Sequence, residues 1–293
     1  MEREESIAQA IFSLANSEME HAEFVIFGIP FDRGQTGKRG SRFAPGLIRE
    51  ASWELESYSI YFDTDLERAK VCDAGDIKGE DFEDVVKKVC EFFKNTRSKV
   101  AIAMGGEHTV SYACVKALLD NSIVTPENFC YVVFDADHDL RDSYEGSVFN
   151  HACTSRRIYE LTKRIVQVGI RTGCREDREF VRKNNIKVFY AWNTSFEALA
   201  KELERFDKIY LSVDMDAFDP CFAPGVATPE PFGLNPEILL KLFERFAGKI
   251  IGMDVVEVVP SPDGITQILA AKIIMEFIAS KMRATSARPS SSP

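Results

Sequence analysis

The sequence lacks three features that would place it in other classes of protein. No apolar run approaches the roughly 20 residues that a helix needs to cross a bilayer. No Cys-x-x-Cys pair occurs, and the seven cysteines are an odd number, so we expect neither a zinc ribbon nor a disulfide framework. The opening stretch MEREESIAQA has no apolar centre and does not resemble a signal peptide. We therefore expect a soluble protein of the reducing cytoplasm.

Positive charge is also in short supply. The chain has 36 Lys and Arg against 46 Asp and Glu, which gives a formal net charge of −10. Phosphate backbones and anionic lipids bind basic surfaces, so we expect neither a nucleic-acid nor a membrane partner. The same surplus of acid suits a small cationic ligand. With 293 residues, 45% of them hydrophobic, the chain can build a large core in one domain.

Short apolar segments alternate with amphipathic segments along most of the chain. This rhythm predicts an α/β fold with a parallel sheet covered on both faces, a three-layer αβα sandwich. We expect a single domain over residues 1–282 and a disordered Ser- and Pro-rich tail over 283–293. The expected strands are 24–30, 100–106, 131–137, 164–171, 186–191, 208–218 and 249–258, and the expected helices are 3–20, from Pro45 onward, 108–119, 175–184, 196–206, 236–247 and 266–282.

The histidine and acidic residues that could bind a ligand follow predicted strands. In open α/β sheets, ligand sites lie beyond the carboxyl ends of the strands. The stretch GGEH follows one such strand, and its glycine pair permits a tight turn that leaves His108 at a strand-to-helix junction. At this junction His108 either caps the following helix or faces a ligand.

The stretch DADHD directly follows the apolar run YVVF. Side chains alternate between the faces of an extended chain, so Asp135, Asp137 and Asp139 can converge on one side while His138 points elsewhere. Converging carboxylates repel one another unless a cation holds them. Oxygen-rich ligation favours Mn, Mg or Ca, and imidazole shifts the preference toward Mn, Fe, Ni or Zn. The alternative is a solvated acidic loop.

Two further strand ends carry carboxylates. Asp214 and Asp216 share a face, and we interpret them as metal ligands, whereas Asp219 precedes Pro220 and is better explained as a turn residue. Glu257 is either an ion-pair partner in the core or a carboxylate that faces substrate. Together, one histidine and five aspartates at three strand ends predict a two-metal hydrolytic centre, with the cations about 3.5–4 Å apart.

In order and spacing, these segments resemble the arginase/agmatinase (ureohydrolase) family over residues 24–280. The segments that carry the resemblance are GIPFDRGQTGKRGSRFAPGLIREAS, which is closer to agmatinases than to arginases, and GGEHT, FDADHD, SVDMDAFDP, APGVATPEP and DVVEVVPSPDG. The resemblance implies an arginase/deacetylase-like α/β fold and two divalent metal ions, with Mn²⁺ as first choice. It also implies a homo-oligomer, either a trimer or a hexamer.

The resemblance further implies a role for each matching position. Asp139 would accept a hydrogen bond from the bridging hydroxide and pass the proton to the leaving amine. Glu257 would pair with the guanidinium of the substrate. His151 would shuttle protons or contact the substrate at the mouth of the site; without the resemblance, it could be a histidine of a surface loop. Thr228 and Glu230 are further candidates for substrate binding. The manganese ligands would be His108, Asp135, Asp139 and Asp214 for one ion, and Asp135, Asp137, Asp214 and Asp216 for the other.

The chain departs from the family pattern at two places. The family reads D-A-H-x-D, but here Asp137 takes the histidine position and His138 the variable one. With Asp137 as a ligand, the second metal position gains a negative charge and loses an imidazole, which makes the ion a weaker Lewis acid. A bulge that turned His138 inward instead would misplace Asp139. The family's GTGTPEPGG loop reads GVATPEPFG over residues 225–233, which alters the surroundings of the substrate.

The resemblance therefore predicts hydrolysis of a guanidino compound. Agmatine, which yields putrescine and urea in polyamine biosynthesis, is the first candidate. Attack on the guanidinium carbon would be stabilised by the metals. Amidine or formimino hydrolysis within the same fold is one alternative, and it would release ammonia or formamide. A catalytically weak metal-binding relative is the other, because of Asp137.

Overall fold

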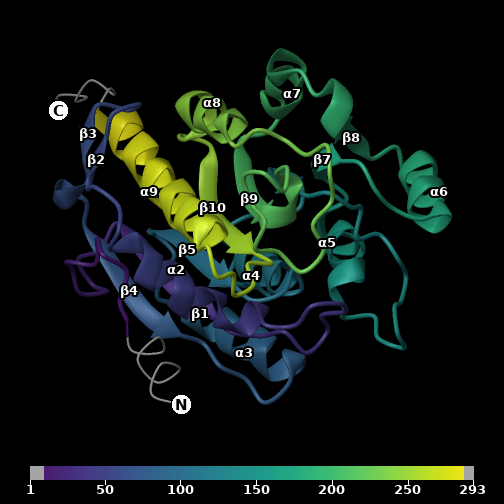
Figure 1. Cartoon of the computed structure of the whole chain (residues 1–293), viewed down its shortest axis with the longest axis horizontal. Coiled ribbons are helices and arrows are strands. Elements are labelled where there is room, and N and C mark those ends of the chain that lie inside the picture. The colour runs from purple at the N-terminus through teal and green to yellow at the C-terminus, as the bar shows by residue number, and fades with distance from the viewer. Residues whose placement is uncertain (1–9, 287–293) are drawn as a thin grey trace.

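An eight-stranded sheet forms the centre of the computed structural model, which describes residues 10–286 (Figure 1). The strands lie in the order β4-β1-β5-β10-β9-β6-β7-β8, and all neighbouring pairs are parallel. A short antiparallel pair stands apart from this sheet, formed by β2 (Tyr58–Ser59) and β3 (Thr64–Asp65). The central strands are β1 (Phe24–Ile29), β4 (Val71–Asp76), β5 (Val100–Gly105), β6 (Phe129–Phe134), β7 (Ile165–Ile170), β8 (Lys187–Tyr190), β9 (Lys208–Asp214) and β10 (Ile250–Val256).

Helices cover both faces of the sheet, as expected for strands that are buried on both sides. One apolar core lies between the sheet and α2, α7, α8 and α9, and the other lies between the sheet and α3, α4, α5 and α6. The predicted three-layer α/β sandwich is therefore confirmed. The helices are α2 (Ala44–Ser52), α3 (Phe82–Phe93), α4 (Val110–Asp120), α5 (Thr154–Thr162), α6 (Arg175–Asn184), α7 (Phe196–Leu203), α8 (Glu237–Phe246) and α9 (Ile265–Ser286).

Successive residues of a central strand enter opposite cores. In β6, Val132 faces one core while Tyr131 and Val133 face the other, and all three are fully buried. Such strands read as continuous apolar runs rather than as alternating patterns. This is why the apolar runs of the sequence located β1 and β5 to β10 within a few residues of their observed ends.

The helix expected over residues 3–20 is wrong for the part that the structure describes. Residues 10–22 contain no helix, and residues 3–9 lie outside the described range. Instead, the backbone amides of Asn16 and Ser17 both donate to the carbonyl of Val71, and the amide of Phe12 donates to Asp73. The segment is thus held along the edge strand β4, where Phe12 and Leu14 are buried while Ile11, at helical spacing from Leu14, is 51% exposed.

Five strands and helices were not predicted, and one helix ends later than expected. The sequence prediction missed β2, β3, β4, α3 and α5. The last helix, α9, continues to Ser286, so residues 283–286 are helical rather than part of the expected tail. Residues 287–293 lie outside the described range. No helix among residues 10–286 is long and apolar enough to span a membrane.

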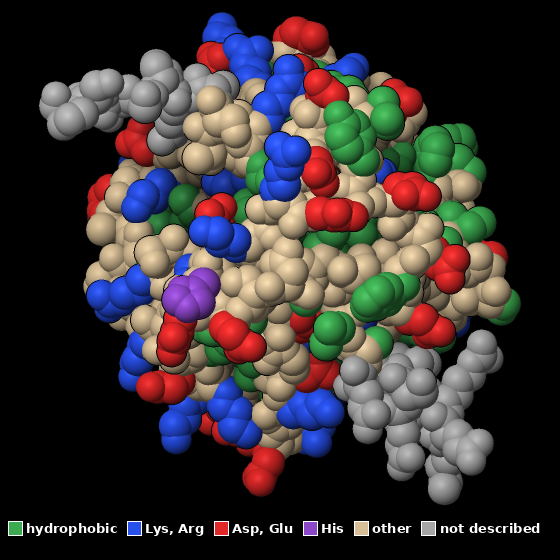
Figure 2. All heavy atoms as spheres, turned by 90° about the vertical axis from the view of Figure 1, so that its left-hand side faces the viewer, with side chains coloured by type: hydrophobic (Ala, Val, Ile, Leu, Met, Phe, Trp, Pro, Cys, Tyr) green, Lys and Arg blue, Asp and Glu red, His purple; other side chains and the backbone are tan. Residues whose placement is uncertain are grey.

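The molecular surface carries mixed charge on the face shown in Figure 2. Lys and Arg side chains are interspersed there with Asp and Glu and with apolar side chains, and the basic groups do not gather in one patch.

Four neighbouring strands at the centre of the sheet bring the predicted site together. β5, β10, β9 and β6 are consecutive in the sheet and run parallel, so their carboxyl ends meet at one edge. The segments GGEH, MDVVE, DMD and DADHD follow or end these strands. The topology therefore brings residues that are distant in sequence into contact, such as His108 and Glu257, which are 149 positions apart.

Candidate metal centre

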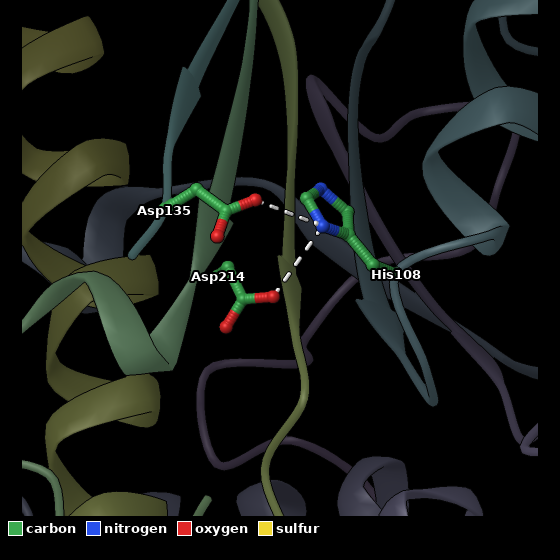
Figure 3. A group of neighbouring side chains, drawn as sticks. All are labelled: His108, Asp135 and Asp214. Atoms are coloured by element: carbon green, nitrogen blue, oxygen red, sulfur yellow. Dashed lines mark ion pairs between the residues drawn. The ribbon is translucent and has the colours of Figure 1, made fainter. Parts of the chain in front are cut away.

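His108, Asp135 and Asp214 form the first of two groups of converging side chains, with the ring of His108 facing the two carboxylates (Figure 3). Its Nδ1 atom lies 3.2 Å from Oδ2 of Asp135, 3.4 Å from Oδ2 of Asp214 and 2.8 Å from Oδ2 of Asp139. All four side chains are buried. His108 therefore faces the carboxylates, although its backbone amide also lies at the beginning of the segment that leads into α4 (Val110–Asp120).

Two atoms of this first group have no hydrogen-bond partner. They are Nδ1 of His108 and Oδ2 of Asp135, both buried and aimed toward one another. Buried polar atoms are almost always hydrogen-bonded, and an orphaned ring nitrogen facing several carboxylate oxygens is what a bound cation would complete. The residues present therefore fit a divalent metal ion.

A second group consists of Asp135, Asp137 and Asp216, whose carboxylate oxygens lie within 4.8 Å of one another. Asp135 thus belongs to both groups. Backbone amides hold these carboxylates in place: the amide of Asp137 donates to Oδ1 of Asp135 at 2.9 Å, and the amide of Ala136 donates to Oδ1 of Asp216, on the neighbouring strand end, at 3.0 Å. In Asp135, one oxygen is fixed by the backbone while the other remains available to a ligand.

Backbone strain is found at two of the predicted site residues. Asp139 has φ of 49° and Glu257 has φ of 64°, in the left-handed region that residues other than glycine rarely adopt. Such conformations persist where the surrounding structure enforces them, and they occur most often at functional sites.

Burial and mutual repulsion dominate the electrostatics of the cluster. Burial, followed by neighbouring carboxylates, raises the pKa of Asp139, Asp214 and Asp216 well above the ordinary value, and burial and Asp137 raise the pKa of Asp135. A divalent cation would offset both effects and keep the carboxylates ionised. Burial opposes protonation of the imidazole, but nearby Tyr131 and the carboxylates together raise the pKa of His108.

Glu257 lies next to the first group and is held on both oxygens. Its Oε1 accepts a hydrogen bond from the backbone amide of His108 at 2.8 Å, and its Oε2 accepts one from the side chain of Gln35 at 2.7 Å. Burial raises the pKa of Glu257, opposed by nearby His151. In the described part of the chain Glu257 makes no ion pair with a lysine or arginine, so the core ion-pair interpretation finds no partner.

His151 is half-buried and contacts the loop that follows β1. Its Nε2 atom lies 2.6 Å from Oγ1 of Thr36 and accepts a longer hydrogen bond, 3.3 Å, from the amide of Thr36. It begins the short 3₁₀ helix η3 (His151–Cys153). His151 is thus not a free surface-loop histidine.

Thr228 and Glu230 do not belong to either group of converging ligands. Thr228 is exposed, and its hydroxyl lies opposite Gly37, on the same loop as Thr36. Glu230 contributes its backbone carbonyl, which accepts a hydrogen bond from Arg171 at 2.6 Å. The structure therefore places Thr228 near the loop that contacts His151, and it shows a backbone contact for Glu230.

His138 lies outside both groups. Its Nδ1 atom is 2.7 Å from Oε1 of Gln167 on β7, and Nε2 of Gln167 donates to the carbonyl of His138 at 2.7 Å. The side chain is buried in this direction. The interpretation of Asp219 as a turn residue is confirmed, because its carboxylate accepts from the amides of Cys221 and Gly233.

Sequence reasoning missed Gln35, Thr36 and Arg171. Gln35 and Thr36 follow β1, a strand next to β5, so their position at the same sheet edge was the available signal. Arg171 follows β7 and was not singled out. Its guanidinium donates to the backbone carbonyls of Gly169, Asp216, Ala217, Phe218, Glu230 and Pro231.

Comparisons with known proteins agree on one family. The profile of the arginase family matches residues 22–279. An agmatinase of Pyrococcus horikoshii is 37% identical over 281 residues, covering 92% of this chain and 96% of that protein. An N(1)-aminopropylagmatine ureohydrolase of Thermococcus kodakarensis is 38% identical over 271 residues, covering 89% and 91%. The crystal structure of the agmatine ureohydrolase of Thermoplasma volcanium superposes with a TM-score of 0.88 at 36% identity, covering 95% and 96%.

Proposed function

The chain belongs to the arginase family, and on this premise we propose that it hydrolyses a guanidino compound, with agmatine as first substrate. Agmatine and water would give putrescine and urea. Relatives named for agmatine and aminopropylagmatine support this substrate class. A net charge of −10 and a carboxylate-rich site suit a cationic substrate.

One observation carries the proposal: buried Nδ1 of His108 and buried Oδ2 of Asp135 converge with further carboxylates while lacking hydrogen-bond partners. Two divalent ions bound there would lower the pKa of a shared water and stabilise negative charge that develops on the substrate. A mixed nitrogen and oxygen donor set supports Mn²⁺ as the metal. The proposed ligands are His108, Asp135, Asp139 and Asp214 for one ion, and Asp135, Asp137, Asp214 and Asp216 for the other.

The remaining residues have proposed roles in binding and proton transfer. Asp139, held in a left-handed conformation against His108, would accept the proton of the attacking water and pass it to the leaving amine. Glu257, buried and fixed on both oxygens, would pair with the guanidinium. His151, at the loop of Thr36, would contact the substrate or shuttle protons, and Thr228 and Glu230 would border the substrate's tail.

We further propose a cytoplasmic homo-oligomer, trimeric or hexameric, that acts in polyamine biosynthesis and has a single domain over residues 1–282. The continuous eight-stranded sheet supports the single domain. The seven free cysteines support a reducing compartment. Exposed apolar side chains near β2 and β3, including Trp53 and Ile60, offer a surface for self-association. Light scattering coupled to size-exclusion chromatography tests the oligomeric state.

A product assay tests the activity. The purified protein, supplied with Mn²⁺, is incubated with agmatine, aminopropylagmatine and arginine, and urea is measured. We expect urea from at least one of them, and none from any would overturn the proposal. Formamide or ammonia in place of urea would instead support formimino or amidine hydrolysis. A large gain in turnover on Asp137→His would support the catalytically weak relative.

A further inference from the structure

The two groups of converging side chains differ in their donor atoms. The group of His108, Asp135 and Asp214 offers a ring nitrogen beside carboxylate oxygens, whereas the group of Asp135, Asp137 and Asp216 offers carboxylate oxygens alone. Asp135 is common to both, so the difference arises from His108 on one side and Asp137 on the other. Oδ2 of Asp135, which is buried and makes no hydrogen bond, lies 3.2 Å from Nδ1 of His108, on the side of the first group.

Apart from His108, which belongs to the first group, the histidine next to Asp137 in the sequence is His138, and its ring is hydrogen-bonded elsewhere. Its ring and its carbonyl are both hydrogen-bonded to Gln167 at 2.7 Å, and its side chain is 1% exposed. Turning the ring toward Asp216 would break the buried hydrogen bond between Nδ1 of His138 and Gln167. Asp137, in contrast, is held toward the second group. Its amide donates to Oδ1 of Asp135, and its own Oδ1 accepts from the amide of Asp139 at 3.3 Å.

We propose that the two metal positions are unequal in selectivity and that Asp137 sets the difference. At the position of Asp135, Asp137 and Asp216, the preference for borderline cations such as Zn²⁺, Co²⁺ or Ni²⁺ over hard cations such as Mn²⁺ or Mg²⁺ is weaker than at the position of His108. This inference rests on the metal centre of the proposed function.

The physical reason lies in ligand softness. Zn²⁺ binds more tightly than Mn²⁺ to nearly all nitrogen and oxygen sites, so the sites differ in the ratio of the two affinities rather than in their order. Imidazole enlarges that ratio, whereas a carboxylate adds Coulomb attraction that is shared by every divalent ion. Asp137 is also only partly buried, so a cation there can keep bound water, as Mg²⁺ requires.

Metal titration of the full chain tests the inference. Isothermal titration and elemental analysis measure Zn²⁺ and Mn²⁺ binding separately in the wild type and in Asp137→His, Asp137→Asn and His138→Gln. We expect Asp137→His to raise the Zn²⁺-to-Mn²⁺ affinity ratio of the second equivalent about tenfold or more. Asp137→Asn should lose most of the second equivalent of either metal. His138→Gln, the matched control, should bind both metals as the wild type does.

Electron paramagnetic resonance supplies a second readout. After one equivalent of Zn²⁺ and then one of Mn²⁺, the wild type should show an uncoupled Mn²⁺ spectrum, whereas two equivalents of Mn²⁺ should show a coupled pair. An unchanged affinity ratio in Asp137→His would overturn the inference, as would selective loss of the second metal in a folded His138→Gln variant. Two selective metal positions without urea formation would leave the inference standing while overturning the proposed activity.

Discussion

The side-chain amide of Gln35 donates a 2.7 Å hydrogen bond to the carboxylate of Glu257, 222 positions later in the chain. The orientation of this amide is fixed, because its oxygen accepts from the hydroxyl of Ser41 at 3.1 Å. The other oxygen of Glu257 accepts from the backbone amide of His108. Glu257, the carboxylate proposed to bind the guanidinium, is therefore held by the loop after β1 and by the segment after β5.

Gln35→Leu should weaken substrate binding more than turnover. The change removes a hydrogen bond to a charged group, worth about 1.5–3 kcal/mol, and so should raise KM for agmatine roughly tenfold or more. Steady-state kinetics over a range of agmatine concentrations measure this. Ser41→Ala is the milder companion variant, since it only loosens the amide. An unaltered KM in Gln35→Leu would mean that Gln35 does not position Glu257.

Asp214→Ala should abolish retention of both metal ions. Oδ2 of Asp214 faces His108 in the first group, and its Oδ1 accepts a hydrogen bond from the amide of Asp216, a member of the second group. Asp214 is therefore the carboxylate that we propose as a ligand of both ions. Elemental analysis after gel filtration gives the stoichiometry. Asp142→Ala, which removes an exposed carboxylate that pairs with Arg156 and Arg157, is the matched control and should keep its metal. Two bound ions in Asp214→Ala would contradict the ligand assignment.

Glu107 should make stability fall as pH rises. Burial, the largest cause, raises the pKa of this fully buried carboxyl group to about 8, against an ordinary value of 4.5, and Glu257 adds to the shift. The folded state therefore keeps a proton that the unfolded chain releases, so the stabilisation is present below about pH 4.5 and is lost as pH rises toward 8. Melting temperatures from pH 5 to 8, measured with a chelator present because metal binding is itself pH-dependent, should fall less steeply in Glu107→Gln. Equal slopes would show that Glu107 is ionised in the folded protein.

Arg171→Met should destabilise the loops that frame the second metal position. The guanidinium donates to the carbonyl of Asp216 and to that of Glu230, both at 2.6 Å, and to four other carbonyls. Leaving such groups unpaired costs about 1–3 kcal/mol. Thermal melting and Mn²⁺ titration should both show a loss. Arg171→Lys should recover only part of it, since an ammonium cannot reproduce the planar fork. Wild-type melting in Arg171→Met would exclude this role.

The three-layer α/β fold could be predicted from the local pattern of apolar residues along the chain. Strands such as β6 are buried on both faces and read as unbroken apolar runs, which a parallel sheet requires. The missed strand β4 has the sequence VCDAGD, and only its first residues are buried, so it lacks that signal. The helix expected over residues 3–20 failed for a related reason. Phe12 and Leu14 pack beside β4 in a segment without helix while Ile11 is exposed, so the apolar residues at helical spacing do not form one buried face.

Strand identity and carboxylate spacing are local properties, so the residue types at the strand ends could be predicted from the sequence. The sequence also indicated that Asp137 and His138 face different ways, since extended backbone alternates its side chains. Which strand ends are neighbours depends on the order of the strands in the sheet, and this order makes His108, Asp135 and Asp214 converge. The contacts of Gln35 with Glu257, and of Arg171 with six carbonyls, likewise depend on loops brought together by sheet order. No local periodicity encodes such contacts, because their energy comes from groups that are distant in the chain.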